Sequence, residues 1–244
     1  MKKFLVYASL FAALPLAAQV ANDQGPLTRQ QGEQILQELR QIRQLLERQA
    51  KLAAQPQEEA PTKAKITDLS GVPMLGSKSA PITIVEFTDY QCQYCQHFHV
   101  TTFAELKKAY IDTGKVRFFS KDLPLDFHPN AMRAAMAARC AGEQGKFWEL
   151  RDTMGANPNS LDMEHIVGFA ANLKMDTAAL RACIDGGKYK ERVQGDVLEA
   201  MRIGANGTPT FIVGKSLGNG VEGELVPGAM PFQMFDLKLK ELAK

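Results

Sequence analysis

The sequence predicts a mixed α/β domain with a block of helices inserted between its strands, preceded by a separate amphipathic helix. A β-branched run, Ile82-Thr-Ile-Val-Glu-Phe-Thr88, follows Pro81 and is typical of a buried strand. Strand-like and helix-like segments then follow one another to the end of the chain, which indicates a mixed sheet covered by helices. Near the N-terminus, apolar residues recur every three or four positions without a proline, as in an amphipathic helix.

Composition narrows the class of protein before any motif is considered. The chain has 244 residues, of which 45% are hydrophobic and 23% charged, enough for one large domain or two small ones. These proportions exclude a collagen-like repeat and a wholly disordered chain. The formal net charge is +2, from 29 basic and 27 acidic side chains, and it falls to zero without Lys2 and Lys3. Such a balance argues against a nucleic-acid partner, and we expect none.

Residues 1–21 have the layout of a secretory signal peptide. Lys2-Lys3 precede a mainly apolar run from Phe4 to Leu16, and small residues follow. At about 1.5 Å per residue the run is too short to span about 30 Å of hydrocarbon as a membrane anchor. We expect cleavage after Ala18 or Ala21 and export to a bacterial periplasm. In that oxidising compartment cysteines can form and exchange disulfides.

Residues 22–54 are predicted to form a helical oligomerisation segment. Apolar residues recur at spacings of four, three and four, at Ile35, Leu39, Ile42 and Leu46. This is the seam of a heptad repeat, and it places Glu38 and Arg43 where they could pair between parallel helices of a dimer or trimer. The alternative is an amphipathic helix folded against its own domain.

The remaining elements follow a linker over residues 55–65, which contains two prolines and no apolar periodicity. The main domain is expected over residues 66–244. After the strand that ends at Thr88, a helix is predicted from Cys92 to Asp112, and a second strand over Lys115–Ser120.

A helical block is predicted over about residues 124–204. Its expected helices are Ala131–Ala141, Phe147–Met154, Leu161–Leu173, Thr177–Ile184 and Tyr189–Ile203. Asn159 or Ser160 and Asp176 can cap helix starts, and Gly186 and Gly204 can close helix ends. The chain then returns to the sheet with a strand over Thr210–Val213, a hairpin partner over Glu222–Val226 and a final helix over Pro231–Leu242.

The strongest chemical signal is Cys92-Gln-Tyr-Cys95, which places two sulfurs one helical turn apart. Thiol exchange needs an exposed nucleophile and a second thiol that can resolve the mixed disulfide. A strand ending at Thr88 would deliver Cys92 to a helix N-terminus, where free backbone N–H groups and the helix dipole favour the thiolate. We therefore expect Cys92 to attack and Cys95 to resolve.

A C-x-x-C pair can also be half of a zinc site. Zinc would need two more ligands, and His97 and His99 lie close by in the sequence. On a helix that starts at Cys92 these four side chains do not converge, so we expect no metal and no cofactor. The alternative function is a non-catalytic holdase or metal chaperone that uses the cysteines as ligands.

Glu86 is a carboxylate in the middle of a strand that otherwise reads as buried. An uncompensated charge there is costly. One hypothesis is that Glu86 accepts the proton of Cys95 when that thiol ionises. The other is a structural acid at a strand edge, paired with a lysine.

Cys140 and Cys183 lie in the helical block. An exported chain with an even number of cysteines tends to pair them, so we expect a structural disulfide. The alternative is two buried free thiols.

Four segments together resemble the DsbA-like branch of the thioredoxin superfamily. They are Pro81–Cys95, Asp122–Leu125 with His128–Ala131, Gln144–Glu149 and Gly207–Phe211. The resemblance covers about residues 66–244 and implies a thioredoxin fold with an inserted helical domain. It further implies that Cys92 is the nucleophile, Cys95 the resolving thiol, Pro209 a cis-proline facing them, and Glu86 the buried acid.

The residues around the thiols depart from the archetypal oxidase, in which Pro-His stands where this chain has Gln93-Tyr94. Tyr94, with Thr208 before Pro209, is more similar to the disulfide isomerases. Gln93, Tyr94, Thr208 and Pro209 are expected to contact the substrate protein, or client. A missing histidine removes a cationic neighbour of Cys92, which should make the disulfide less oxidising.

The resemblance implies two kinds of partner. The clients would be unfolded or wrongly disulfide-bonded exported proteins. The membrane redox partner would be DsbB-like for an oxidase and DsbD-like for an isomerase. Assembly through residues 22–54 would match the oligomeric, ScsC-like members of the branch.

Overall fold

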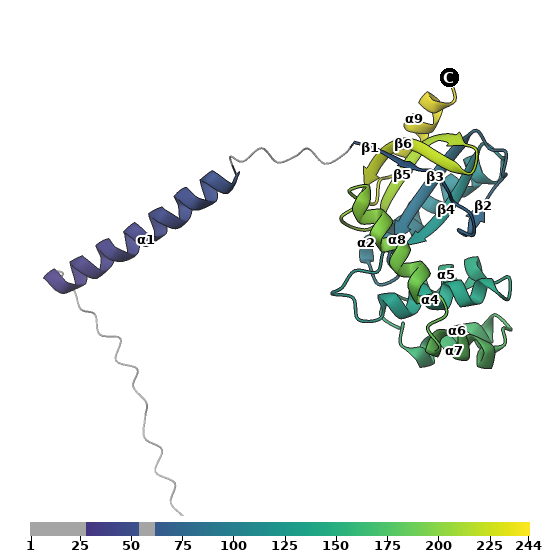
Figure 1. Ribbon diagram of the computed structural model, residues 1–244, viewed down its shortest axis with the longest axis horizontal. Helices are drawn as coiled ribbons and strands as arrows, with labels where there is room; N and C mark the ends of the chain where they lie inside the picture. The colour runs from purple at the N-terminus through teal and green to yellow at the C-terminus, as the bar shows by residue number, and fades with distance from the viewer. Residues whose placement is uncertain (1–27, 54–61) are drawn as a thin grey trace, which may run out of the picture. The chain divides into compact units, whose positions relative to one another are not determined.

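The computed structural model describes residues 28–53 and 62–244, which fall into two separate units. The first contains a single helix, and the second contains the sheet and the other helices (Figure 1). The predicted signal peptide and most of the predicted linker lie outside the described residues. Within those residues, no helix combines the length and apolar character needed to cross a membrane.

Helix α1 (Arg29–Ala53) forms the first unit. It begins with a capping box, in which the Thr28 hydroxyl accepts the Gln31 N–H and Gln31 Oε1 accepts the Thr28 N–H at 2.9 Å. Its apolar side chains are exposed along one stripe, at Ile35, Leu36, Leu39, Ile42, Leu45 and Leu46. Arg43 pairs with Glu47 of the same helix at 2.8 Å. Assembly through this stripe remains a prediction.

Six strands form one mixed sheet in the order β1-β6-β5-β3-β4-β2. Their bounds are β1 Lys63–Ile66, β2 Met74–Leu75, β3 Ile82–Thr88, β4 Val116–Asp122, β5 Thr210–Leu217 and β6 Gly220–Pro227. Strands β3 and β4 run parallel, and the other pairs are antiparallel. All residues of β3 are buried at the centre of the sheet, as the β-branched run predicts.

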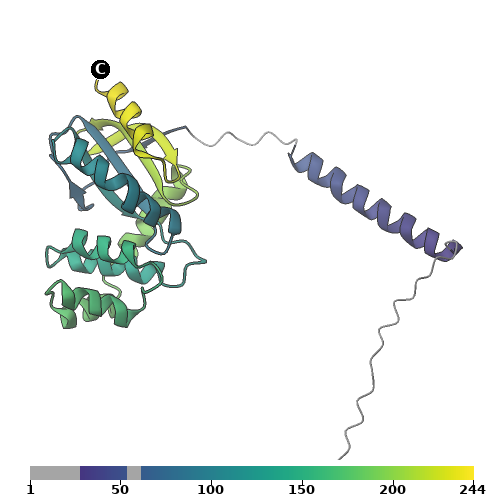
Figure 2. The same cartoon turned by 180° about the vertical axis from the view of Figure 1, so that it is seen from behind.

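Side chains of β3 alternate between two apolar layers, because successive residues of a strand point to opposite faces. Ile82 and Ile84 pack with the helices on one face, whereas Val85 and Phe87 pack with the residues on the other. The first layer is covered by α9 (Phe232–Leu242) and by a continuous helix made of α2 (Gln93–Phe98), η1 (His99–Phe103), α3 (Ala104–Leu106) and η2 (Lys107–Ile111). Figure 2 shows these helices across the same face of the sheet. By this alternation Glu86 points to the face of the cysteine-bearing helix.

The segments η1 and η2 are π-helical, so the predicted helix over Cys92–Asp112 forms with two local widenings. Such stretches are uncommon and often occur at functional sites. The first of them begins at His99, directly after the turns that carry the two cysteines.

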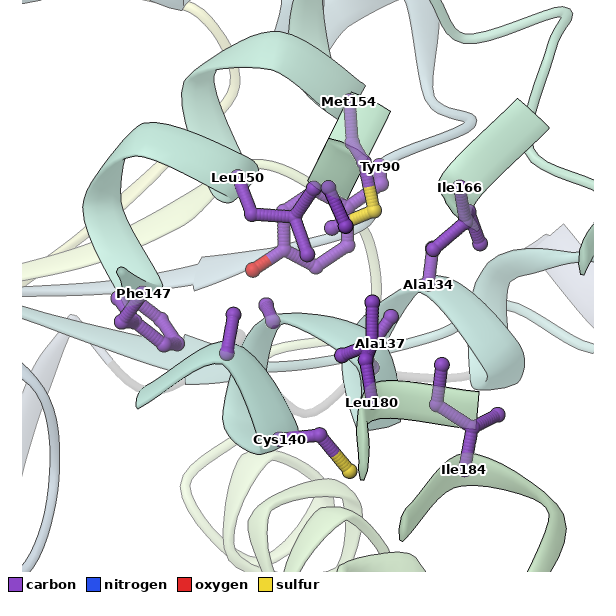
Figure 3. Close-up of a cluster of buried hydrophobic side chains, with 14 of the residues drawn as sticks. Tyr90, Ala134, Ala137, Cys140, Phe147, Leu150, Met154, Ile166, Leu180 and Ile184 are labelled. Atoms are coloured by element: carbon purple, nitrogen blue, oxygen red, sulfur yellow. The ribbon is translucent and has the colours of Figure 1, made fainter. Parts of the chain in front are cut away.

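Five helices form the insertion between β4 and β5, as predicted. They are α4 (Ala131–Gly142), α5 (Phe147–Ala156), α6 (Met163–Asn172), α7 (Thr177–Asp185) and α8 (Lys190–Arg202). Helices α4 to α7 gather at one end of the sheet (Figure 1, Figure 2). They share a core of small and aliphatic side chains, drawn in Figure 3, into which Tyr90 from the loop after β3 also inserts.

A disulfide joins Cys140 of α4 to Cys183 of α7, with 6.0 Å between the two Cα atoms. These are the two cysteines that the sequence pairs. The bond closes a loop with a sequence separation of 43 residues. By loop-closure entropy, such a crosslink stabilises the folded state by about 4 kcal/mol.

Buried ion pairs fix the insertion to the end of β4. Asp196 on α8 accepts hydrogen bonds from Lys121 and from Arg139, both at 2.6 Å. Arg139 also donates to Asp122 at 2.7 Å. Because each charge has a partner, the desolvation cost of burying the group is offset, and α4 and α8 are held in register with the strand.

Three local features differ from the sequence expectations. Strand β1 begins at Lys63, inside the predicted linker, and pairs with β6. Strand β2 is a two-residue edge strand that no pattern indicated. Helix α6 is capped by Asp162, whose carboxylate accepts two backbone N–H groups, rather than by Asn159 or Ser160. Asp176 caps α7 as expected.

Candidate functional site

Cys92 lies at the N-cap of α2, at the end of the loop after β3. Figure 1 labels this helix and strand β3, which precedes it in the chain. The loop is held by Asp89, a buried carboxylate that accepts the backbone N–H groups of Gln91 at 2.7 Å and Leu125 at 2.8 Å. Asp89 also contacts His128 Nδ1 at 2.8 Å. These bonds place the first sulfur where the unpaired N–H groups of the helix start are concentrated.

The sequence led us to expect an exposed first cysteine, and here the structure differs. Only 5% of the Cys92 surface is exposed. Its sulfur lies 3.3 Å from the backbone carbonyl oxygen of Thr208, to which the protonated thiol donates, so the segment before β5 covers the sulfur. Local sequence around Cys92 could not reveal this cover, which comes from more than a hundred residues further along the chain. The neighbours Gln93 and Tyr94 are exposed.

The first sulfur ionises readily. The hydrogen bond from Cys95, together with the Thr208 side chain and the backbone N–H groups of Cys95 and Tyr94, lowers the pKa of Cys92 to about 5. Burial acts in the opposite direction and is outweighed. At neutral pH Cys92 is therefore a thiolate, the form that attacks disulfides.

The second sulfur behaves in the opposite way. Burial, above all, raises the pKa of Cys95 well above its usual value, and the negative charges of Cys92 and Glu86 add to the effect. The Asp89 N–H donates to Cys95 Sγ at 3.4 Å. Both thiols are free in this structure. The pair thus combines one ionised and one protonated sulfur, as an attacking and a resolving thiol require.

Glu86 is fully buried and has two partners. Its Oε2 accepts a hydrogen bond from Arg151 Nη2 at 2.5 Å, and its Oε1 lies 3.0 Å from His99 Nε2. Burial would raise the pKa of Glu86, but its contacts with His99 and Arg151 outweigh burial and lower the pKa to about 2. The structural hypothesis expected an acid at a strand edge that pairs with a lysine. Instead, Glu86 lies within the central strand and pairs with Arg151 and His99. The role of Glu86 as a proton acceptor remains a prediction.

Sequence reasoning did not assign Arg151 to the site and considered His99 only as a metal ligand. Arg151 is 65 residues from Glu86 in the sequence and comes from α5 of the insertion. A signal for His99 was present, because it follows Cys95 by four residues and so shares its helix face. For Arg151 no local pattern exists, since only the packing of α5 brings it to β3.

Pro209 follows a cis peptide bond, and Thr208 before it contacts Cys92. A surface cavity of about 570 Å³ lies beside them, lined by Thr62, Gly204, Asn206, Gly207, Thr208, Pro209, Thr210, Leu225, Pro227 and Gly228. The Thr208–Pro209 segment thus lies between the first sulfur and a surface groove.

No three His, Cys, Asp or Glu side chains converge on a metal site within residues 28–53 and 62–244. The imidazole of His97 is exposed, whereas that of His99 turns inward to Glu86. The structure therefore brings His99, Glu86 and Arg151 together and leaves His97 outside this group.

Comparison with known proteins places the chain in a family. A family model described as Thioredoxin matches residues 69–221. The Na(+)/H(+) antiporter NhaA of Herminiimonas arsenicoxydans is 35% identical over 138 residues, 57% of this chain and 21% of the antiporter. The chain thus spans about a fifth of that relative's length.

Two further relatives are matched over most of their length. Disulfide bond formation protein D of Bacillus subtilis is 27% identical over 154 residues, 59% of this chain and 68% of that protein. The crystal structure of alpha-DsbA1 from Wolbachia pipientis superposes with a TM-score of 0.64 at 24% identity, over 72% of this chain and 93% of that one. Since the family match covers more than half of the chain and includes both Cys92 and Cys95, the chain belongs to the thioredoxin family and has the fold of its DsbA-like members.

Proposed function

We propose that this protein is a thiol:disulfide oxidoreductase that exchanges disulfides with folding exported proteins through Cys92 and Cys95. The observation that carries the proposal is the opposite ionisation of the two sulfurs, with the pKa of Cys92 lowered to about 5 and that of Cys95 raised. A structural pair of cysteines has no need of this difference. The relatedness to disulfide bond formation protein D supports the same activity.

The exchange follows from the two thiols. The Cys92 thiolate attacks a sulfur of a client disulfide, forming a mixed disulfide and releasing one client thiolate. Cys95 then loses its proton and attacks Cys92 Sγ, which closes the Cys92–Cys95 disulfide and frees the second client thiolate. Run in reverse, the same steps pass a disulfide to a client.

The client is expected to reach Cys92 between two surfaces of the site. Gln93 and Tyr94 offer exposed side chains on one side, and the Thr208–Pro209 segment lies on the other. An extended client chain has free backbone groups that can pair with such a segment. Because Cys92 is 5% exposed, only a sulfur presented at this opening can react.

Export and assembly complete the proposal. The leader over residues 1–21 would deliver the protein to the periplasm, where disulfides are made.

The apolar stripe of α1 would bind the same stripe of one or two further copies, since its spacing is that of a coiled-coil seam. Sedimentation of the full chain and of a Leu39→Asp/Leu46→Asp variant tests the assembly. An equal mass for both proteins contradicts it.

Trapping tests the exchange reaction directly. In Cys95→Ser the mixed disulfide cannot be resolved, so the variant should carry client proteins as adducts that reductant releases. Cys92→Ser is the matched control and should carry none. Absence of adducts on Cys95→Ser, with a free and folded protein, contradicts the proposed activity.

Disulfide formation and isomerisation use the same site and differ in its resting state. An oxidase rests as the Cys92–Cys95 disulfide and needs a DsbB-like membrane partner, whereas an isomerase rests reduced and needs a DsbD-like one. The redox state of the two thiols in cells, measured with refolding of scrambled ribonuclease A, separates these activities. Oxidised thiols without unscrambling indicate an oxidase.

A further inference from the structure

His99 lies one helical turn after Cys95 and takes part in the buried charge group around Glu86. Its backbone N–H donates to the Cys95 carbonyl oxygen, and its side chain is 14% exposed. The ring Nε2 lies 3.0 Å from Glu86 Oε1 and 3.0 Å from Arg151 Nη2. Unlike the carboxylate and the guanidinium, an imidazole gains and loses a proton close to neutral pH.

The two contacts of Nε2 make opposite demands. Without a proton, Nε2 can accept a hydrogen bond from Arg151, but Glu86 Oε1 then has no donor. This buried oxygen has no hydrogen-bond partner among the residues that the structure describes, and neither does His99 Nδ1. With a proton on both ring nitrogens, Nε2 donates to Oε1, while Arg151 keeps its bond to Oε2. In the Nδ1–H tautomer, in which Nε2 accepts from Arg151, protonation of Nε2 therefore gives Glu86 Oε1 the donor that it lacks.

We propose that His99 accepts the proton that the Cys95 thiol releases during disulfide exchange, with Glu86 and Arg151 as the residues that position its ring. The inference rests on the proposed function and names the group that serves its second step. The Cys95 S–H bond breaks, the proton comes to rest on His99 Nε2, and the Cys95 sulfur forms the bond to Cys92 Sγ. The bond between Cys92 and the client breaks at the same time, and its electron pair leaves with the client thiolate.

In the reverse direction the imidazolium returns the proton to Cys95 when that sulfur leaves the disulfide. Glu86 alone is poorly suited to this task, because the buried Arg151 guanidinium donates to its Oε2 and favours the ionised carboxylate. A proton on His99 instead adds a positive charge 3.0 Å from that carboxylate, which stabilises it.

The surroundings of His99 favour transfer within the group. Glu86 contacts it from β3 and Arg151 from α5, and Cys95 lies one turn earlier on the same helix; Asp152 pairs with Arg151 at 3.1 Å. The aromatic rings of Phe98 and Phe103 lie at centroid distances of 5.2 and 5.3 Å from the imidazole. The buried Tyr90 hydroxyl is close enough for Glu86 and Arg151 to influence its pKa, which burial raises well above its usual value.

The test separates the two steps of exchange by using 5,5′-dithiobis(2-nitrobenzoate). Attack by Cys92 releases the first nitrothiobenzoate, and resolution by Cys95 releases the second. We expect the second rate of the wild-type protein to rise with pH in a transition that His99→Gln loses, with a slowing of about a hundredfold. The first rate should stay within about twofold.

The matched control is His97→Gln, which changes an exposed histidine on the same helix and should keep both rates and the transition. A His99→Gln protein that keeps the pH transition and the second rate overturns the inference. Absence of the first release in the wild-type protein overturns the proposed function, and the inference with it.

Discussion

The Cys92 sulfur lies 3.3 Å from the carbonyl oxygen of Thr208, so residues far apart in the sequence form its surroundings. The rate of alkylation of Cys92 should follow a titration with a midpoint near 5. Since Cys95 is the main cause of the lowered pKa, Cys95→Ala should move the midpoint towards 9.0. Thr208→Val should produce a smaller rise. A midpoint above 8 in the wild-type protein would contradict the assignment of Cys92 as the attacking sulfur.

The stability of the reduced protein should depend on pH in a way that the oxidised protein does not share. The pKa of Cys92 is lower in the folded state, so between about pH 5 and 9 the unfolded chain binds more protons. The free energy of unfolding of the reduced form, minus that of the oxidised form, should therefore increase from pH 5 to 9. The slope is at most about 1.4 kcal/mol per pH unit. Urea unfolding of both forms measures it, and a flat difference would disagree.

Removing Arg151 should destabilise the protein strongly, because it leaves Glu86 as a buried charge with fewer partners. We expect Arg151→Met to lower the free energy of unfolding by about 3–5 kcal/mol. Adding Glu86→Gln removes the stranded charge and should restore part of the loss. Denaturant unfolding of the two single variants and the double variant gives the coupling. Simple additivity of the two losses would show that the pair does not act as one unit.

Replacing both Cys140 and Cys183 by alanine should lower the free energy of unfolding by about 4 kcal/mol. The bond joins two helices of the insertion, and the groups that lower the pKa of Cys92 lie elsewhere. The alkylation midpoint of Cys92 should therefore stay near 5. A stable double variant with a shifted midpoint would mean that the disulfide acts on the site instead.

Much of the site could be predicted because its signals are local. The strand that ends at Thr88, the helix start at Cys92 and the spacing to Cys95 all lie within one short segment. A carboxylate within that strand is visible without any knowledge of its neighbours. The main helices could be predicted for the same reason, since each one buries a face with its own periodicity.

The partners of these residues could not be predicted, because they come from distant parts of the chain. Arg151 reaches Glu86 only when α5 packs against the sheet, and Thr208 covers Cys92 only when β5 pairs with β3. Strand β2 is too short for an alternating pattern to show. Strand β1 has only four residues and follows two prolines, so its polar and apolar alternation is too short to distinguish from a linker.

The Cys140–Cys183 disulfide between α4 and α7 must itself form when the protein folds. Forming such a bond is the kind of reaction proposed for this protein. A newly made chain has four thiols, which can form a first bond in several wrong ways, and only Cys140 with Cys183 gives the insertion its native crosslink. The reactive Cys92 thiol competes with Cys140 and Cys183 in forming this first bond. Under the proposed function, each new copy would need the same disulfide chemistry that it later supplies to other proteins.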